Sequence, residues 1–288
     1  MRVNRTSKAS VGILWVSFFA WVGCEGSDAI PSVVWHTDNP EVIFTGAICE
    51  GECGSSDLCG QCPATSQITV GSSLFRIDAT EVSNGDYLVF SDIHYSLARQ
   101  SEECTWNKTF MPVAGWPPPS AVLNHPVVYV NWCQAQAYCA WAGKRLCGKV
   151  GSGAGKWVSQ SSTSLDSQWF YACTGGDVNR AFPYGASYVA ASCNGREYWP
   201  TVEADSVVTG SIASCQAPAI PGLFDMSGNV YEWTDECKTD DNVANRDQIC
   251  RRRGGSFYSM ESLLRCASLV SRVREHVDDF TGFRCCKD

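Results

Sequence analysis

Residues 222–233 hold the densest group of side chains that could do chemistry in this chain. The stretch reads Gly-Leu-Phe-Asp-Met-Ser-Gly-Asn-Val-Tyr-Glu-Trp, with turn-forming residues between Asp225 and Glu232. Calcium binds carboxylate and backbone carbonyl oxygens supplied by one compact loop. The spacing is not that of an EF-hand. The stretch therefore predicts either a calcium-binding loop or an ordinary turn leading into a half-buried strand with Tyr231 and Trp233.

Cysteines form the second candidate chemistry. The chain has 17 of them, and setting Cys24 aside leaves an even 16, enough for eight disulfides in an oxidising compartment. One close cluster could instead be a four-thiolate zinc site, but it lacks two Cys-x-x-Cys pairs, and disulfides are favoured. The cluster consists of Cys49, Cys53, Cys59 and Cys62.

Other reactive patterns are weak. Gly151–Lys156 is one residue short of a phosphate loop, and Trp157 stands where Ser or Thr would bind magnesium. The four histidines are scattered without metal-ligand spacing. The net charge of -8 argues against a nucleic-acid partner. We expect the one basic run, 251–253, to begin a strand with solvated arginines.

The N-terminus indicates export. Basic residues precede the apolar run 11–20, which is too short to span a bilayer and is typical of a secretory signal. Cys24 follows in a sequence that resembles a bacterial lipobox. We therefore expect a signal peptide over 1–24, a Cys/Gly-rich linker or cap over 25–67 and one domain over 68–288. The protein would lie in the cell envelope, either lipid-anchored to the membrane at Cys24 or simply cleaved.

Regular elements are few and short. The alternation of apolar and polar residues predicts strands over 68–70 and 74–82. A helix with Ser83 as its N-cap is expected to follow. A short strand over 126–130 precedes a helix that Asn131 and Gln134 start with a capping box. Long irregular segments surround these elements, and short strands are expected at 254–257 and 282–285.

Together these motifs resemble the formylglycine-generating enzyme family, the sulfatase-modifying factors. The resemblance implies an α+β fold, an elaborated C-type-lectin-like (sulfatase-modifying-factor) fold with short twisted strands, few helices and much irregular loop. It covers roughly residues 68–288. Six motifs occur in the family's order: Ala79–Phe90, Pro126–Leu146, Phe182–Gly185, Gly222–Trp233, Arg253–Phe257 and Gly282–Cys285.

The resemblance also implies two calcium sites and two disulfides. The family disulfides correspond to Cys139 with Cys285 and Cys173 with Cys266. Proximity in sequence suggests Cys193 with Cys215 and Cys237 with Cys250. One calcium site would use Asp225, Glu232 and the carbonyls of Gly228 and Val230. The other would use Asn194, Asp205 and the carbonyls of Gly195 and Val207.

The departure from the family concerns the catalytic thiols. Catalytic members hold copper(I) between two cysteines after the Gly-Gly-Ser motif, and copper(I) requires soft thiolate ligands. Here Ser259 stands near the first position, and no cysteine stands at the second. Copper is therefore not expected. The leading hypothesis is a non-catalytic module that binds a peptide or glycan in the family's substrate groove.

The alternative is a formylglycine-generating oxidase with a non-standard thiol pair such as Cys285 and Cys286. A thiol-based oxidase must keep at least one free cysteine, whereas the binding module needs none. The residues expected to line the groove are Tyr231, Trp233, Ser256, Tyr258, Ser259 and Arg265.

Overall fold

The computed structural model describes residues 48–157, 163–199 and 203–288. The predicted signal peptide and Cys24 lie outside these ranges. No helix in the described part has the length and hydropathy that a membrane span requires.

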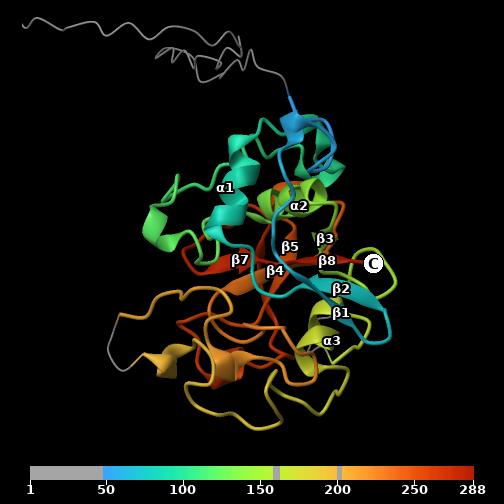
Figure 1. Cartoon of the computed structure of the whole chain (residues 1–288). Helices are drawn as coiled ribbons and strands as arrows, with labels where there is room; N and C mark the ends of the chain where they lie inside the picture. Colours follow the sequence, from blue (N-terminus) through green and yellow to red (C-terminus); the bar gives the residue numbers. More distant parts are fainter. Residues whose placement is uncertain (1–47, 158–162, 200–202) are drawn as a thin grey trace, which may run out of the picture. The chain divides into compact units, whose positions relative to one another are not determined.

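Two small sheets form the centre of the described unit (Figure 1). The first is antiparallel with the order β1-β2-β8-β3. The second has the order β6-β5-β4-β7, and its β4–β7 pair is parallel. The strands are β1 (Gln67–Val70), β2 (Phe75–Asp78), β3 (Arg145–Leu146), β4 (Tyr231–Lys238), β5 (Ile249–Arg253), β6 (Val270–Val273), β7 (Thr281–Phe283) and β8 (Cys285–Lys287).

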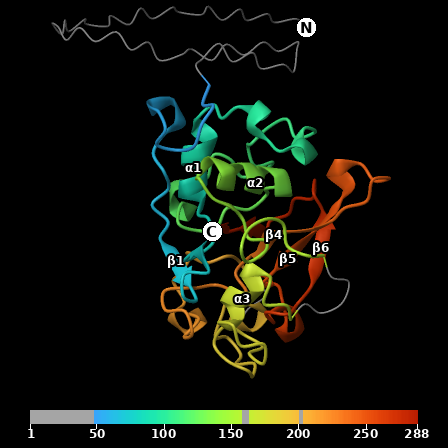
Figure 2. The same cartoon turned by 90° about the vertical axis from the view of Figure 1, so that its right-hand side faces the viewer.

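Three short α-helices flank the sheets, with α1 and α2 at one end and α3 at the other (Figures 1 and 2). They are α1 (Asn84–Asp92), α2 (Trp132–Trp141) and α3 (Gln168–Thr174). Eight 3-10 turns join the rest: Asp57–Cys59, Leu97–Arg99, Glu102–Cys104, Ser120–Val122, Arg196–Tyr198, Ala213–Cys215, Asn245–Asp247 and Glu261–Leu263.

Side-chain caps start the helices as the sequence predicts. The Ser83 hydroxyl accepts the Asp86 amide, and Asn131 and Gln134 form a reciprocal capping box. Both arrangements satisfy amides that the first turn leaves without partners. Gly143 follows the C-terminal end of α2. Its φ of 66° lies in the left-handed region, which ends the helix.

Two strand predictions are wrong. Over 126–130 only Pro126 forms a bridge, to Ser83, and Tyr129 has φ 60°, which no extended strand allows. At 254–257 the chain has already left β5, because Gly254 and Gly255 have φ values of 87° and 77°. The alternation of apolar residues did not reveal these left-handed positions.

The Cys-rich N-terminal segment packs onto the domain as a cap, and the compact unit extends over 47–288. The Cys53 amide donates to the Trp141 carbonyl at 2.8 Å, and the Trp141 indole donates to the Cys59 carbonyl at 2.9 Å. Trp141 thus connects this segment to α2. The four clustered cysteines are paired as Cys49–Cys59 and Cys53–Cys62, so the zinc alternative does not hold.

Candidate functional site

The segment after β5 contains Ser259, which the family resemblance puts near the expected copper position. Ser259 is 3 % exposed, and its hydroxyl accepts the Ser256 amide at 2.9 Å. The same hydroxyl lies 3.2 Å from the Tyr231 hydroxyl, to which it donates. These oxygen donors are hard ligands, and they are already engaged with one another. The residues here therefore do not fit copper(I), which prefers thiolate or thioether sulfur.

No free thiol is found in the described residues. All sixteen cysteines there form eight disulfides. Both pairs implied by the family resemblance are present, Cys139–Cys285 and Cys173–Cys266. The remaining pairs outside the N-terminal cap are Cys104–Cys133, Cys147–Cys286, Cys193–Cys215 and Cys237–Cys250.

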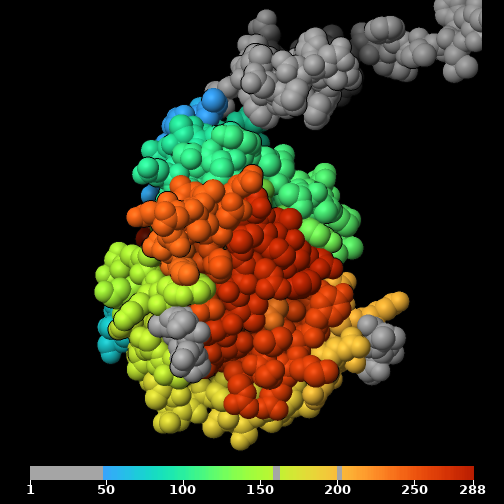
Figure 3. Space-filling model, turned by 180° about the vertical axis from the view of Figure 1, so that it is seen from behind, coloured from blue at the N-terminus to red at the C-terminus, as the bar shows by residue number. Residues whose placement is uncertain are grey.

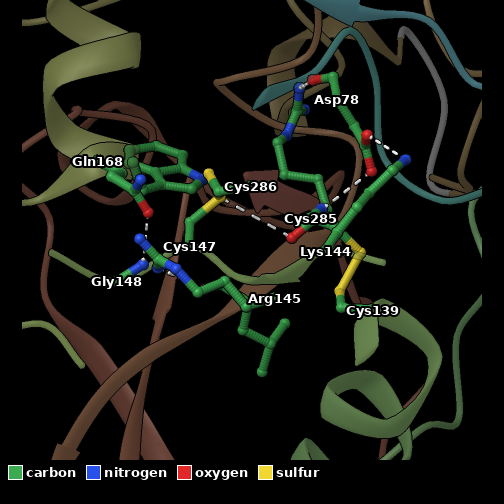
Figure 4. Close-up of a disulfide and its surroundings, with 12 residues drawn as sticks. Asp78, Cys139, Lys144, Arg145, Cys147, Gly148, Gln168, Cys285 and Cys286 are labelled. Carbon is green, nitrogen blue, oxygen red and sulfur yellow. Dashed lines mark hydrogen bonds and ion pairs between the residues drawn. A yellow bond between two sulfur atoms is a disulfide. The ribbon is translucent and has the colours of Figure 1, made fainter. Parts of the chain in front are cut away.

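The alternative thiol pair is therefore not available. Cys285 and Cys286 are adjacent in β8, but each is bonded to a different partner (Figure 4). Successive residues of a strand point to opposite faces, so the two sulfur atoms diverge. Both cysteines are fully buried.

The expected groove divides into a buried layer and an exposed layer. Trp233 and Ser256 are wrong as groove residues, because they are 0 % and 1 % exposed. The Trp233 indole donates to the Val130 carbonyl in the core at 3.1 Å. Tyr231 and Ser259 are buried as well, at 5 % and 3 % exposure, so a ligand would not reach them directly. Ligands could reach Tyr258 among the expected residues, since its side chain is 48 % exposed.

Two further apolar side chains are exposed beside Tyr258. Met260 is 64 % exposed and Leu263 is 38 % exposed. Arg265 forms an ion pair with Glu261 and lies 5.4 Å from the centre of the Phe182 ring. We call Tyr258, Met260 and Leu263 the apolar strip. Neither Met260 nor Leu263 was predicted to lie in the groove, because the sequence does not show which apolar side chains are exposed.

The first expected calcium site is built around an arginine. Both oxygens of Glu232 accept from Arg284 at 2.7 Å, and the Trp169 indole donates to the same carboxylate at 2.8 Å. Asp225 accepts the Gly210 amide at 2.6 Å. Glu232 is thus surrounded by donors rather than open to a cation. Neither Arg284 nor Trp169 was identified from the sequence.

A third carboxyl group, Glu81, completes this buried cluster. Burial, followed by repulsion from Asp225, raises the pKa of Glu81 well above its usual range. Burial also raises the pKa of Asp225. The pKa of Arg284 is raised because attraction to Glu232, Glu81 and Asp225 outweighs its own burial. The arginine is thus the positive charge around which three carboxyl groups are packed.

At the second expected calcium site, the side-chain amides of Asn194 and Asn229 form hydrogen bonds with neighbouring loops. The Asn194 side chain donates to the Asp205 carbonyl at 2.9 Å and accepts the Trp199 indole at 2.7 Å. Asn229 accepts the Val207 amide at 2.9 Å. Gly195 lies beside Leu264 and the Ser259 carbonyl, so a side chain would not fit there. The structure does bring these loops together.

Neither set of oxygens fits a calcium ion in this arrangement. The Glu232 carboxylate and the Asn194 side-chain oxygen, both expected ligands, already accept protein donors, and calcium needs six to eight oxygen ligands. In the described ranges, no group of three or more His, Cys, Asp or Glu side chains could hold a metal. Calcium therefore has no role in the function proposed below.

The basic run 251–253 is buried, contrary to the expectation of solvated arginines. Arg253 donates to Glu236 at 2.6 Å, and both side chains are almost fully buried. Arg252 pairs with Asp278 at 2.6 Å and lies 4.7 Å from the Tyr231 ring centre. The run forms β5 in the middle of a sheet, where each charge is matched by an acidic partner or an aromatic ring.

Comparison with known proteins shows to which family the chain belongs. A family model described as a sulfatase-modifying factor enzyme 1-like domain matches residues 39–288. The formylglycine-generating enzyme of Mus musculus is 27% identical over 286 residues, 80% of this chain and 69% of that protein. The inactive C-alpha-formylglycine-generating enzyme 2 of Bos taurus is 28% identical over 175 residues, 57% of this chain and 50% of that protein. A crystal structure of CarF has a TM-score of 0.48 at 19% identity, covering 74% of this chain and 85% of that one.

Proposed function

The chain belongs to the family of sulfatase-modifying factor enzyme 1-like domains, and on that basis we propose that it is a member that binds peptides without oxidising them. One observation carries the proposal. Every cysteine in the described residues is in a disulfide, so none is free for the first copper position, near which the family resemblance puts Ser259. A hydroxyl cannot replace a thiolate on copper(I).

The apolar strip supports a peptide as the ligand. Tyr258, Met260 and Leu263 are exposed apolar side chains within one six-residue segment that also holds the buried Ser259. Exposed apolar groups that lie together mark sites of protein or ligand contact. Methionine adapts its shape to different apolar partners. A glycan is the weaker candidate, because the three residues of this strip are apolar, although the exposed Arg265 and Glu261 of the same segment could meet hydroxyl groups.

The disulfides support a place outside the cytoplasm. Eight of them lie within the described residues, and disulfides persist in oxidising compartments. We therefore propose an exported protein of the cell envelope, with Cys24 as a lipid anchor. Mass spectrometry of the mature N-terminus tests the anchor.

A conversion assay tests the absence of oxidase activity. The purified protein is loaded with copper(I) and given oxygen and a peptide with the Cys-x-Pro-x-Arg sulfatase motif, and mass spectrometry detects formylglycine. A catalytic formylglycine-generating enzyme is the positive control. We expect no conversion above the copper-only background. Conversion by this protein would overturn the proposal and favour the oxidase.

A binding selection tests the peptide. A displayed random-peptide library is selected on the wild-type protein, and the enriched peptides are titrated against the Tyr258→Ser/Met260→Ser variant. We expect the variant to bind them about tenfold or more weakly, because anchor side chains dominate such contacts. The control is Val113→Ser, at a residue that is 61 % exposed elsewhere. Equal binding by both variants would rule out the apolar strip.

The oxidase remains the second candidate function. The observation that favours it is the match to the mouse enzyme over 80% of this chain. It would need a thiol pair that the described residues do not provide.

A further inference from the structure

A polar cavity of about 620 Å³ lies at the far end of β4, away from the Ser259 segment. Its walls come from the turn 102–104, the glycine loop at Ala154, the end of β4, the segment 239–245 and Arg274. In Figure 3 the orange chain around 240–248 lies against the teal chain around 100. The cavity is thus formed by segments far apart in the sequence.

A bulge in β4 directs one carboxyl group to this cavity. The β4–β5 register shifts between Trp233 and Cys237, and Asp235 lies within the shift. Its amide donates to the Cys147 carbonyl, and its carbonyl accepts from Gly155, so neither group pairs with β5. Bulges re-aim side chains and occur frequently beside functional sites. The Asp235 carboxyl group makes no hydrogen bond with the described residues.

A buried arginine lines the same cavity. Arg274 is 5 % exposed, and its Nε has no hydrogen-bond partner in the described part of the chain. Its guanidinium stacks 4.8 Å from the centre of the Trp132 ring and donates to the Asn245 carbonyl. That nitrogen is itself enclosed and does not face a ligand, so the arginine contributes to the cavity as a positive charge in its wall.

The carboxyl groups attract the arginine without pairing directly with it. Glu103 and Asp235 line the cavity with Arg274 and act on its charge, but no ion pair joins them among the described residues. Asp240 and Asp241 add further negative charge at the rim. Among the described residues, no group of His, Cys, Asp and Glu there could hold a metal. The cavity therefore presents one arginine and several carboxyl groups to whatever fills it.

We propose that this cavity binds a basic amino acid. The ligand's carboxylate would accept from Arg274, and its ammonium groups would lie against Asp235 and Glu103. A ligand with two ammonium groups and one carboxylate matches this excess of acid over base. The volume accommodates a molecule the size of lysine. The inference does not depend on the proposed peptide surface, which involves other residues.

Titration of the full-length protein with L-lysine tests the proposal by calorimetry at pH 7.5. L-Norleucine lacks the side-chain ammonium group, and cadaverine lacks the carboxylate. We expect L-lysine to bind, and each analogue to bind about tenfold or more weakly, because one charge-assisted contact is lost. Norleucine binding as tightly as lysine would overturn the assignment. So would the absence of any heat at about 10 mM L-lysine, which would reveal millimolar affinity.

Single substitutions test which side chains of the cavity bind L-lysine. Asp235→Asn and Glu103→Gln should each weaken L-lysine binding about tenfold. Arg274→Gln should weaken L-lysine but leave cadaverine unchanged. The control is Asp92→Asn, at an exposed carboxyl group at the end of α1. Thermal unfolding of each variant shows that it is folded. Wild-type affinity in a folded Asp235→Asn protein would overturn the proposal.

The pH dependence gives an independent readout. Burial raises the pKa of Asp235 to about 6. Binding should therefore weaken as pH falls from 7.5 to 5, and in Asp235→Asn this change should be largely lost. A profile unchanged by the substitution would contradict the role of Asp235. The charged groups that face Asp235 are Arg145, Glu103, Arg274 and Glu236.

Discussion

At the scale of single residues, Asp235 is a carboxyl group that folding makes harder to ionise. Burial raises its pKa from 3.8 to about 6, and the favourable charges of Arg145 and Arg274 only partly oppose this. A raised pKa means that the folded state favours the protonated form. Its contribution to stability is therefore fully present below about pH 4 and is lost as pH rises through 6.

Asp235→Asn should stabilise the protein at neutral pH. The amide cannot ionise, so the free energy of unfolding at pH 7.5 should rise by about 3 kcal/mol. At pH 4 the gain should be much smaller, since the aspartate is then protonated in the folded state. Urea unfolding at the two pH values measures the difference. The same gain at both values, or an equal gain in Asp92→Asn, would contradict this explanation.

Arg284 is the opposite case, a buried charge on which three carboxyl groups depend. Arg284→Gln leaves Glu232 without its two hydrogen bonds at 2.7 Å. Removing one partner of a buried pair costs about 3–5 kcal/mol. We expect that loss in urea unfolding at pH 7.5, and a smaller loss at pH 4, where carboxyl groups can protonate. A loss no greater than that of Arg272→Gln, an exposed arginine of β6, would show that the cluster does not need the charge.

At the scale of elements, β8 is joined twice to one short stretch of chain. Cys139 in α2 bonds Cys285, and Cys147 after β3 bonds Cys286. Each bond alone closes a loop of more than a hundred residues, with separations of 146 and 139. Once one is formed, however, the other closes only the short path between 139 and 147. The two bonds are therefore partly redundant.

Removing these disulfides should be strongly non-additive. The loop-entropy relation gives about 3 kcal/mol for losing either bond and about 8 kcal/mol for losing both. The variants are Cys139→Ala/Cys285→Ala, Cys147→Ala/Cys286→Ala and the fourfold substitution. Urea unfolding measures each. If the variant with all four cysteines substituted lost only the sum of what the two separate variants lose in free energy of unfolding, the two bonds would not be redundant.

At the scale of the whole molecule, the chain is an irregular fold stabilised by disulfides from cap to C-terminus. In the part of the chain that the structure describes, the three α-helices and eight strands are short, and much of the rest is loop. Short elements bury little apolar surface each, so cross-links compensate by restricting the unfolded chain. A thiol-dependent reaction would require one of these bonds to be open.

A thiol count checks this description. The protein is denatured in guanidinium without reductant and alkylated, and its peptides are identified by mass spectrometry. We expect no label on the cysteines of residues 48–288, and label on all sixteen after reduction. Label on Cys285 or Cys286 before reduction would reopen the oxidase alternative.

Local signals in the sequence determined a definite part of this protein. The caps at Ser83 and Asn131, the even number of cysteines left once Cys24 is set aside and the missing thiol at Ser259 could be read directly, because each depends on residues close in the chain or on residue identity. The order of six motifs identified the family, and with it the fold class. These conclusions need no knowledge of which side chains are buried.

Tertiary structure decided the rest, because burial and charge pairing depend on segments far apart in the sequence. It placed the 251–253 arginines inside a sheet and Trp233 in the core. It set Arg284 against Glu232, where the sequence alone suggested calcium. It also aligned Glu103, Asp235 and Arg274 around one cavity. No periodicity could show these contacts, since each joins residues that only the folded chain brings together.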